Sequence, residues 1–161
     1  YLDEKYVMSA QLLDETGKTL IDTVPVVVDG SQQDAASSAA YETAPGQPIF
    51  GARESSVYPI KDLDDKQKVF YCFPDMRVRN LGRFRLRFML FYLPDEDSPF
   101  PRANTILATV TSDVFTVYNA RDFPGIGKTT ALSKKLSSQG VPIPNRNKDR
   151  LKYNDGDSTD G

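Results

Sequence analysis

The residues whose types and spacing come closest to a chemical site form a glycine-rich turn, Gly125-Ile126-Gly127-Lys128-Thr129-Thr130. The turn follows a predicted strand and precedes a predicted helix, as a phosphate-binding P-loop does. The P-loop pattern G-x-x-x-x-G-K-[ST] requires glycine at position 122, where this chain has Asp122. An aspartate places negative charge beside the phosphates, and Pro124 removes a backbone N–H that would bind them. The sequence therefore favours an ordinary strand-to-helix turn over a nucleotide site.

Groups for acid–base, nucleophilic or metal chemistry are scarce elsewhere. The chain has no histidine and one cysteine, which removes the usual general base and argues against a zinc site. Cys72 lies between two aromatic residues, so we interpret it as a small core residue rather than a reactive thiol. The acidic clusters at 62–65 and 95–97 lack EF-hand spacing and are interpreted as solvated loop charge. We therefore predict no enzymatic activity, metal, cofactor or small-molecule substrate.

Length and composition are typical of one soluble domain. The 161 residues are 39% hydrophobic with a mean hydropathy of -0.45, and no apolar run approaches the roughly 20 residues of a membrane-spanning helix. The charged first residues, YLDEKYVM, do not resemble a secretory signal, and a single cysteine favours a cytosolic or nuclear setting. We predict one domain over residues 1–148 and a disordered tail over residues 149–161.

Charge is distributed unevenly along the chain. The formal net charge is -2, yet acidic residues dominate the first 66 positions and eight basic residues lie within 121–152, where Asp122 and Asp149 are the only acidic ones. A basic C-terminal portion on a mildly acidic protein indicates an anionic partner for that part.

The elements that must position these groups are mainly strands. Residues 83–90 alternate charge with bulk, which is typical of a half-buried strand. One face then carries Arg83, Arg85 and Arg87, and the other carries Phe84, Leu86, Phe88 and Leu90. Residues 69–73 predict a short strand antiparallel to it. The arginine face is either a solvent-facing surface paired with carboxylates or a surface that binds a partner or phosphates.

Further strands are predicted along the rest of the chain, at residues 5–13, 19–28, 48–51, 56–60, 105–110 and 114–118. Residues 29–51 are rich in Ser, Ala, Gln, Gly and Pro and predict a flexible insertion. A helix is predicted at 131–139, capped by Thr129 or Thr130, with Leu132 and Leu136 on its buried face and Gly140 ending it. Seven or eight short strands with one late helix favour an all-β sandwich.

Three segments resemble the velvet domain of fungal regulatory proteins: FPDMRVRNLGRFRLRFMLF (73–91), SDVFTVYNARDFPGI (112–126) and TALSKKLSSQGVPIPNR (130–146). The front segment YVMSAQLLDETGKTL resembles the VelB-like subgroup. The resemblance implies an immunoglobulin-like, Rel-homology-like β-sandwich with one C-terminal helix and a long flexible insertion. It also implies a nuclear regulator, shuttling with the cytoplasm, that binds DNA and forms homodimers or heterodimers with other velvet proteins to control sporulation, sexual development and secondary metabolism.

One departure bears on DNA binding. The family's basic loop, of the type RARxCGxGEKDRRPIDPPP, has no counterpart in these 161 residues, so we expect a sandwich and a dimer surface without that DNA contact. From their charge and position, we predict that six basic residues face DNA: Arg77, Arg79, Arg121, Lys128, Lys134 and Lys135. The bland alternative for the lysines, and for the basic residues after 145, is a solvated surface and tail.

A second hypothesis is a protein-interaction module that heterodimerises without touching DNA. Its partner-binding surface would be apolar residues around the helix, for which a core role is the alternative. These residues are Phe123, Ile126, Val141 and Ile143.

Overall fold

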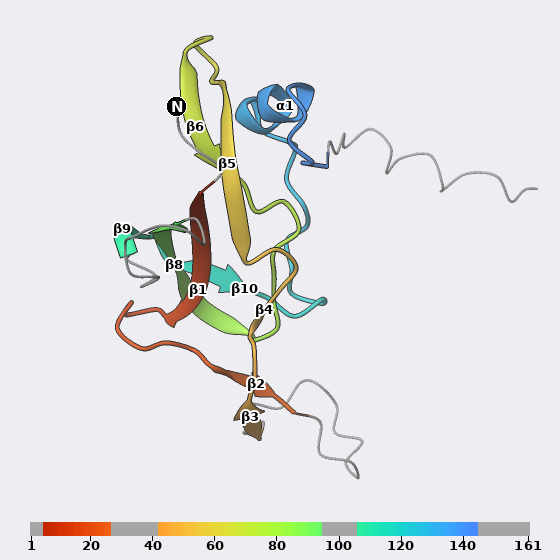
Figure 1. Ribbon diagram of the computed structural model, residues 1–161. Helices are drawn as coiled ribbons and strands as arrows, with labels where there is room; N and C mark the ends of the chain where they lie inside the picture. The colour runs from red at the N-terminus through yellow and green to blue at the C-terminus, as the bar shows by residue number, and fades with distance from the viewer. Residues whose placement is uncertain (1–4, 27–41, 95–105, 145–161) are drawn as a thin grey trace, which may run out of the picture. The chain divides into compact units, whose positions relative to one another are not determined.

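The computed structural model describes residues 5–26, 42–94 and 106–144, which belong to two compact units (Figure 1). The sheet unit comprises residues 1–57 and 71–123, and the hairpin–helix unit comprises residues 58–70 and 124–161. The predicted tail and the acidic cluster at 95–97 lie outside the described residues. Within the described residues, no helix is long and apolar enough to cross a membrane.

The centre of the sheet unit is a pair of long antiparallel strands. β8 (Gly82–Tyr92) pairs with β1 (Tyr6–Asp14) over nine residues, from Tyr6 opposite Tyr92 to Asp14 opposite Phe84. Directly opposed residues point to the same face of a sheet, so this register aligns the apolar face of β8 with that of β1. Phe84 is buried and Arg83 is exposed, as the predicted alternation requires, but residues 85–88 are all half-buried and Met89, on the arginine face, is buried as well.

Three more strands extend this pair. On the β1 side lies the first half of β5 (Glu54–Lys61), with Val7 opposite Ser56. Two short strands, β9 (Ile106–Thr111) and β10 (Phe115–Val117), follow one another along the opposite edge of β8. At the turn between them, the Ser112 N–H donates to the Leu86 carbonyl at 2.8 Å, and the Ser112 hydroxyl accepts from the Leu86 N–H at 2.9 Å.

A small ribbon forms a second layer over the apolar face. It consists of β4 (Ile49–Phe50) and β7 (Arg77–Val78), with Ile49 opposite Val78. Leu12, Ile49 and Phe84 form the buried centre between the layers, where each side chain contributes about 1.5–3 kcal/mol through burial. A further ribbon pairs β2 (Thr23–Pro25) with β3 (Thr43–Pro45). The all-β class with layered strands is therefore confirmed.

Several predicted elements differ from the observed ones. The strand predicted at 19–28 is reduced to β2, which Pro25 ends. Of the insertion predicted at 29–51, residues 29–41 lie outside the described part, while 43–45 and 49–50 form β3 and β4. β6 (Gln67–Tyr71) pairs with β5, not with the arginine-bearing strand, because a five-residue turn joins the two as a hairpin.

The hairpin–helix unit combines the second half of β5, β6 and α1 (Ala131–Ser138). Thr130 caps the helix by accepting the Ser133 N–H on its hydroxyl at 3.1 Å. Gly140 ends it with a φ of 99°, as predicted, and such a left-handed conformation favours glycine. Leu136 is buried, and Leu132, one turn earlier on the same face, is 37% exposed, so the burial predicted for this face is complete only at Leu136.

Candidate nucleic-acid and partner interface

The helix α1 lies beside the β5–β6 hairpin (Figure 1), and side-chain contacts hold it there. The Gln139 amide donates to the Lys61 carbonyl at 2.8 Å and accepts the Lys61 N–H at 2.8 Å, so it pairs with the strand as a neighbouring backbone would. Lys135 forms an ion pair with Asp65 at 2.6 Å. Lys135 lies in the last turn of α1 and Gln139 is its C-cap, so both contacts hold the C-terminal end of the helix.

The hairpin turn is built around the buried carboxylate of Asp62. This carboxylate accepts the backbone N–H groups of Asp64 and Lys66 at 2.9 and 3.0 Å and pairs with the Lys68 ammonium. The Lys68 hydrogen bond is the main reason why the pKa of Asp62 lies below 3.8, and Lys135 lowers the pKa of Asp65 in the same way. The acidic cluster at 62–65 is thus structural.

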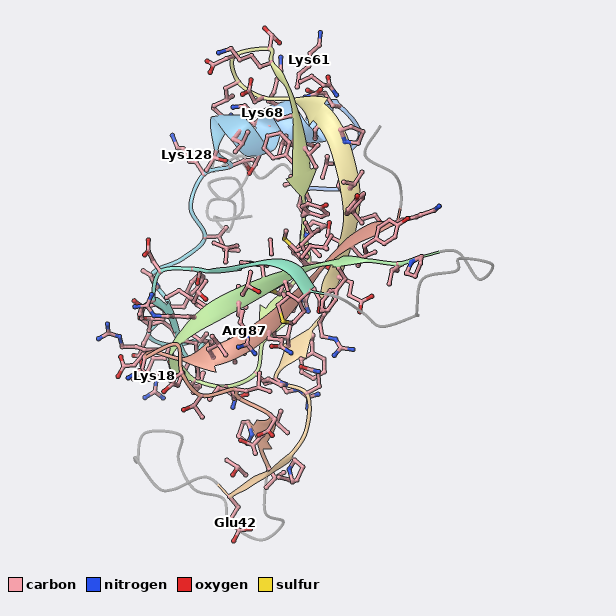
Figure 2. All side chains as sticks on the ribbon, turned by 60° about the vertical axis from the view of Figure 1, so that its left-hand side comes forward. Lys18, Glu42, Lys61, Lys68, Arg87 and Lys128 are labelled. Atoms are coloured by element: carbon pink, nitrogen blue, oxygen red, sulfur yellow. The ribbon has the colours of Figure 1, made fainter. Side chains whose placement is uncertain are left out.

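Four lysines on the described part of the hairpin–helix unit, called uncommitted here because they form no ion pair with a described residue, are Lys61, Lys66, Lys128 and Lys134, although the charge of Lys61 helps to lower the pKa of Asp65. The side chains of all four are exposed. Figure 2 shows Lys61 on the hairpin and Lys128 just before the helix. Because Lys135 is paired and Lys134 is not, the two adjacent DNA-facing candidates have different surroundings.

The outer face of the β4–β7 ribbon combines two arginines with an aromatic ring. Arg77 lies opposite Phe50 on the side away from the core, and both it and Arg79 are exposed. The Arg79 guanidinium lies 3.7 Å from the centroid of the Phe50 ring, a cation–π contact that orients it. Exposed, oriented guanidinium groups suit contacts with phosphates.

The arginines of β8 form contacts within the chain. Arg85 donates to the carbonyls of Glu15 at 2.8 Å and Ser112 at 2.9 Å, and Arg87 donates to the Gln11 side chain at 3.2 Å through Nε. Arg83 pairs with the Glu15 carboxylate at 3.3 Å. Figure 2 labels Arg87 on the sheet. Of the two interpretations of this face, the structure favours the internally paired surface.

A short loop after β10 presents two exposed aromatic rings. The Asn119 and Asp122 side chains close it, because Asp122 donates its N–H to Asn119 Oδ1 at 2.8 Å and accepts from Asn119 Nδ2 at 2.6 Å. Tyr118 and Phe123, at the two ends, have ring centroids 6.3 Å apart and are 45% and 49% exposed. Arg121 lies between these two residues in the sequence, and its side chain is also exposed. Exposed aromatic and arginine side chains are enriched in binding hot spots.

The four partner-binding candidates have different environments. Phe123 and Ile126 are exposed, at 49% and 57%, as a docking surface requires. Val141 is only 2% exposed and Ile143 is half-buried, because the chain after Gly140 turns back and the Val141 N–H donates to the Leu136 carbonyl at 3.3 Å. Val141 was therefore wrongly predicted to be accessible, and the alternative core role fits it.

The candidate residues do not form one cluster within a unit. Arg77, Arg79, Arg121 and Phe123 belong to the sheet unit, and the remaining ones belong to the hairpin–helix unit. Lys61, Lys66 and Tyr118 are exposed residues that were not among the predicted site residues. Lys61 and Lys66 flank the acidic cluster at 62–65, and their exposure beside the helix depends on the hairpin pairing. Tyr118 lies in a predicted strand. Its spacing of five residues from Phe123 could have indicated that one short loop brings the two aromatic rings together.

The described residues contain no group of three or more His, Cys, Asp or Glu side chains arranged to hold a metal ion. A pocket of about 210 Å³ in the sheet unit, between β1, Leu20 and Arg53, is smaller than most ligand sites. Cys72 is half-buried, and burial raises the pKa of its thiol above 9.0, which lowers the thiolate fraction. The predicted absence of catalysis and of cofactors stays a prediction.

Comparison with known proteins identifies the class. The sequence profile described as velvet factor matches residues 3–150 of this chain, so the chain belongs to the velvet factor family. This agrees with the resemblance carried by the segments at 73–91, 112–126 and 130–146.

Individual relatives carry regulatory names. The chain is 33% identical over 159 residues to the sexual development regulator velC of Gibberella moniliformis, a match that covers 97% of this chain and 31% of the relative. It is 40% identical over 95 residues to the sexual development regulator VELC of Pyricularia oryzae, covering 59% and 22%. It is 34% identical over 120 residues to velvet complex subunit 2 of Botryotinia fuckeliana, covering 65% and 27%. The chain thus spans less than a third of the length of these relatives.

Proposed function

We propose that this chain is a regulator module of fungal development that binds DNA through exposed basic residues and dimerises with velvet-type partners in the nucleus, shuttling with the cytoplasm. Family membership supports the regulatory role, and the names of relatives, sexual development regulator and velvet complex subunit, support partnership with other velvet proteins. Control of sporulation and secondary metabolism is part of the same proposal.

The observation that carries DNA binding is the group of uncommitted cations on the hairpin–helix unit. Exposed lysines without carboxylate partners bind phosphates by releasing counterions, without first breaking an internal ion pair. Lys128 and Lys134 meet this condition, whereas Lys135 is engaged with Asp65. We therefore retain Lys128 and Lys134 as DNA contacts, together with Arg77, Arg79 and Arg121, and assign Lys135 to positioning the helix.

The test is duplex DNA binding by fluorescence anisotropy over a salt series. Lys134→Glu is expected to weaken binding about tenfold at low salt and to flatten the salt dependence. Lys18→Glu, an equal change of net charge on an exposed loop of the sheet unit, is the matched control and is expected to change affinity much less. If both variants lose DNA affinity equally, Lys134 contributes only through the net charge of the chain and not through a specific contact with DNA.

A second candidate function, heterodimerisation without DNA contact, is favoured by the exposed Tyr118–Phe123 pair and Ile126. A gel shift with and without an added velvet domain separates the two functions. Binding to DNA by the chain alone supports the first, and a shift that requires the partner supports the second. In that case Phe123→Ala is expected to abolish the partner-dependent shift, while Leu81→Ala, another exposed apolar residue of the sheet unit, leaves it intact.

A further inference from the structure

Within the described residues, the strand β9 has one unpaired edge. It pairs with β8, and no other described strand pairs with it (Figure 1). All six of its residues, ILATVT, are exposed, and Ile106, Leu107 and Val110 are 51%, 50% and 59% exposed. Edge strands are normally protected by lysine, proline or inward-pointing charge, because their free N–H and C=O groups pair readily with another strand. β9 contains none of these residues.

The backbone groups that point outward can be assigned from the ladder. The Ser112 N–H donates to the Leu86 carbonyl, and in an antiparallel pair every second residue faces the partner strand in this way. Val110 and Ala108 therefore direct their N–H and C=O groups toward β8. Thr109 and Thr111 direct theirs away from it, to the free edge.

We propose that two copies of this chain pair antiparallel through β9, with Thr109 opposite Thr109 of the second copy. This deepens the proposed dimerisation and rests on it. In this register the two Thr109 residues exchange backbone hydrogen bonds, and Val110 of each copy lies opposite Ala108 of the other, a large residue beside a small one. Because β9 carries no charge, a two-fold axis brings no like charges together, so a second copy suits this edge better than a charged segment does.

The first test is the oligomeric state of the whole chain by sedimentation equilibrium over a concentration series. Thr109→Pro removes an outward-facing donor and leaves the β8 ladder intact, since proline is tolerated on the solvent side of an edge strand. The wild type is expected to dimerise, and the variant is expected to dissociate at least tenfold more readily with an unchanged circular dichroism spectrum. Thr116→Pro, on exposed β10, is the matched control and is expected to remain dimeric.

A charge-swap experiment tests the register. Thr109→Lys places two ammonium groups opposite each other across the axis, and Thr109→Glu places two carboxylates there, so each variant alone is expected to be monomeric. An equimolar mixture is expected to recover the dimer. A monomeric wild type, a dimer that survives Thr109→Pro, or a mixture that stays monomeric would overturn the proposal. Proposed heterodimerisation and DNA binding are measured separately, by mixing with another velvet domain and by anisotropy, and survive each of these outcomes.

Discussion

At the scale of single residues, Arg85 shows how a charged side chain can tie a sheet together. Its guanidinium joins two turns that are far apart in sequence, through the carbonyls of Glu15 and Ser112. Two carbonyls in different directions suit a planar donor fork, which a lysine ammonium does not reproduce. Arg85 is therefore structural, although the sequence alone cannot distinguish it from a ligand-binding arginine.

Replacing Arg85 by lysine is expected to lower the free energy of unfolding by about 1–2 kcal/mol, because at least one of the two carbonyls loses its donor. Urea unfolding measures the change. Arg83→Lys is the control, since its exposed pair with Glu15 is expected to contribute less than about 0.5 kcal/mol. Equal effects of both substitutions would contradict the structural role of Arg85.

Gly51 controls the approach of β4 to the turn before β7. It has a φ of 75°, and a Cβ there would lie 2.3 Å from the Asp75 carbonyl oxygen. Gly51→Ala is therefore expected to destabilise the fold by more than about 2 kcal/mol and to disturb the ribbon that carries Arg77 and Arg79. Gly17 has the same φ of 75°, but the atom nearest to its Cβ would be Arg85 Cδ, at an ordinary contact distance of 3.4 Å. Gly17→Ala therefore isolates the backbone cost, about 1–2 kcal/mol by thermal unfolding, and an equal loss in both variants would exclude the clash.

At the scale of elements, two carboxylates connect the hairpin turn to its surroundings. Asp62 organises the turn, and Asp65 holds α1 through Lys135. The pKa of each carboxyl is lowered from 3.8, mainly by its lysine partner. A carboxyl with a lowered folded-state pKa stabilises the fold above its unfolded pKa, and this stability is lost as the pH falls through the folded value.

The hairpin–helix contact is therefore expected to be unchanged between pH 7 and 5 and to weaken below about pH 4. The amide NMR signals of Lys61 and of the Gln139 side chain report it directly, since these groups bond to each other. Asp65→Asn removes the ionisable partner of Lys135 and is expected to reduce the acid-dependent change. A transition centred near pH 6 would contradict the assignment, because neither carboxyl titrates there.

At the scale of the whole molecule, the features that could be predicted from the sequence are the ones set by local chemistry. Alternation along β8 and the helix limits at Thr130 and Gly140 depend on period and on capping residues that lie within a few positions. Strand pairing depends on distant residues, so the partner of β6 was predicted wrongly. The burial of Val141 and the ion pair of Lys135 likewise depend on what the fold brings beside them, and neighbours such as Lys134 and Lys135 look equivalent in sequence.

The separation of the basic candidates into two units leads to a last prediction. Arg77 and Arg79 lie on the sheet unit, and Lys128 and Lys134 lie on the hairpin–helix unit. If both pairs contact one DNA duplex, neutralising either pair with glutamine removes about two phosphate contacts, and the slope of log affinity against log salt falls by about 1.8. The two pairs share no partner, so their effects are expected to add. In the quadruple variant the slope of log affinity against log salt is expected to fall by about 3.6. Anisotropy over a salt series measures all three slopes, and a quadruple variant no flatter than one double variant would show that only one unit contacts DNA.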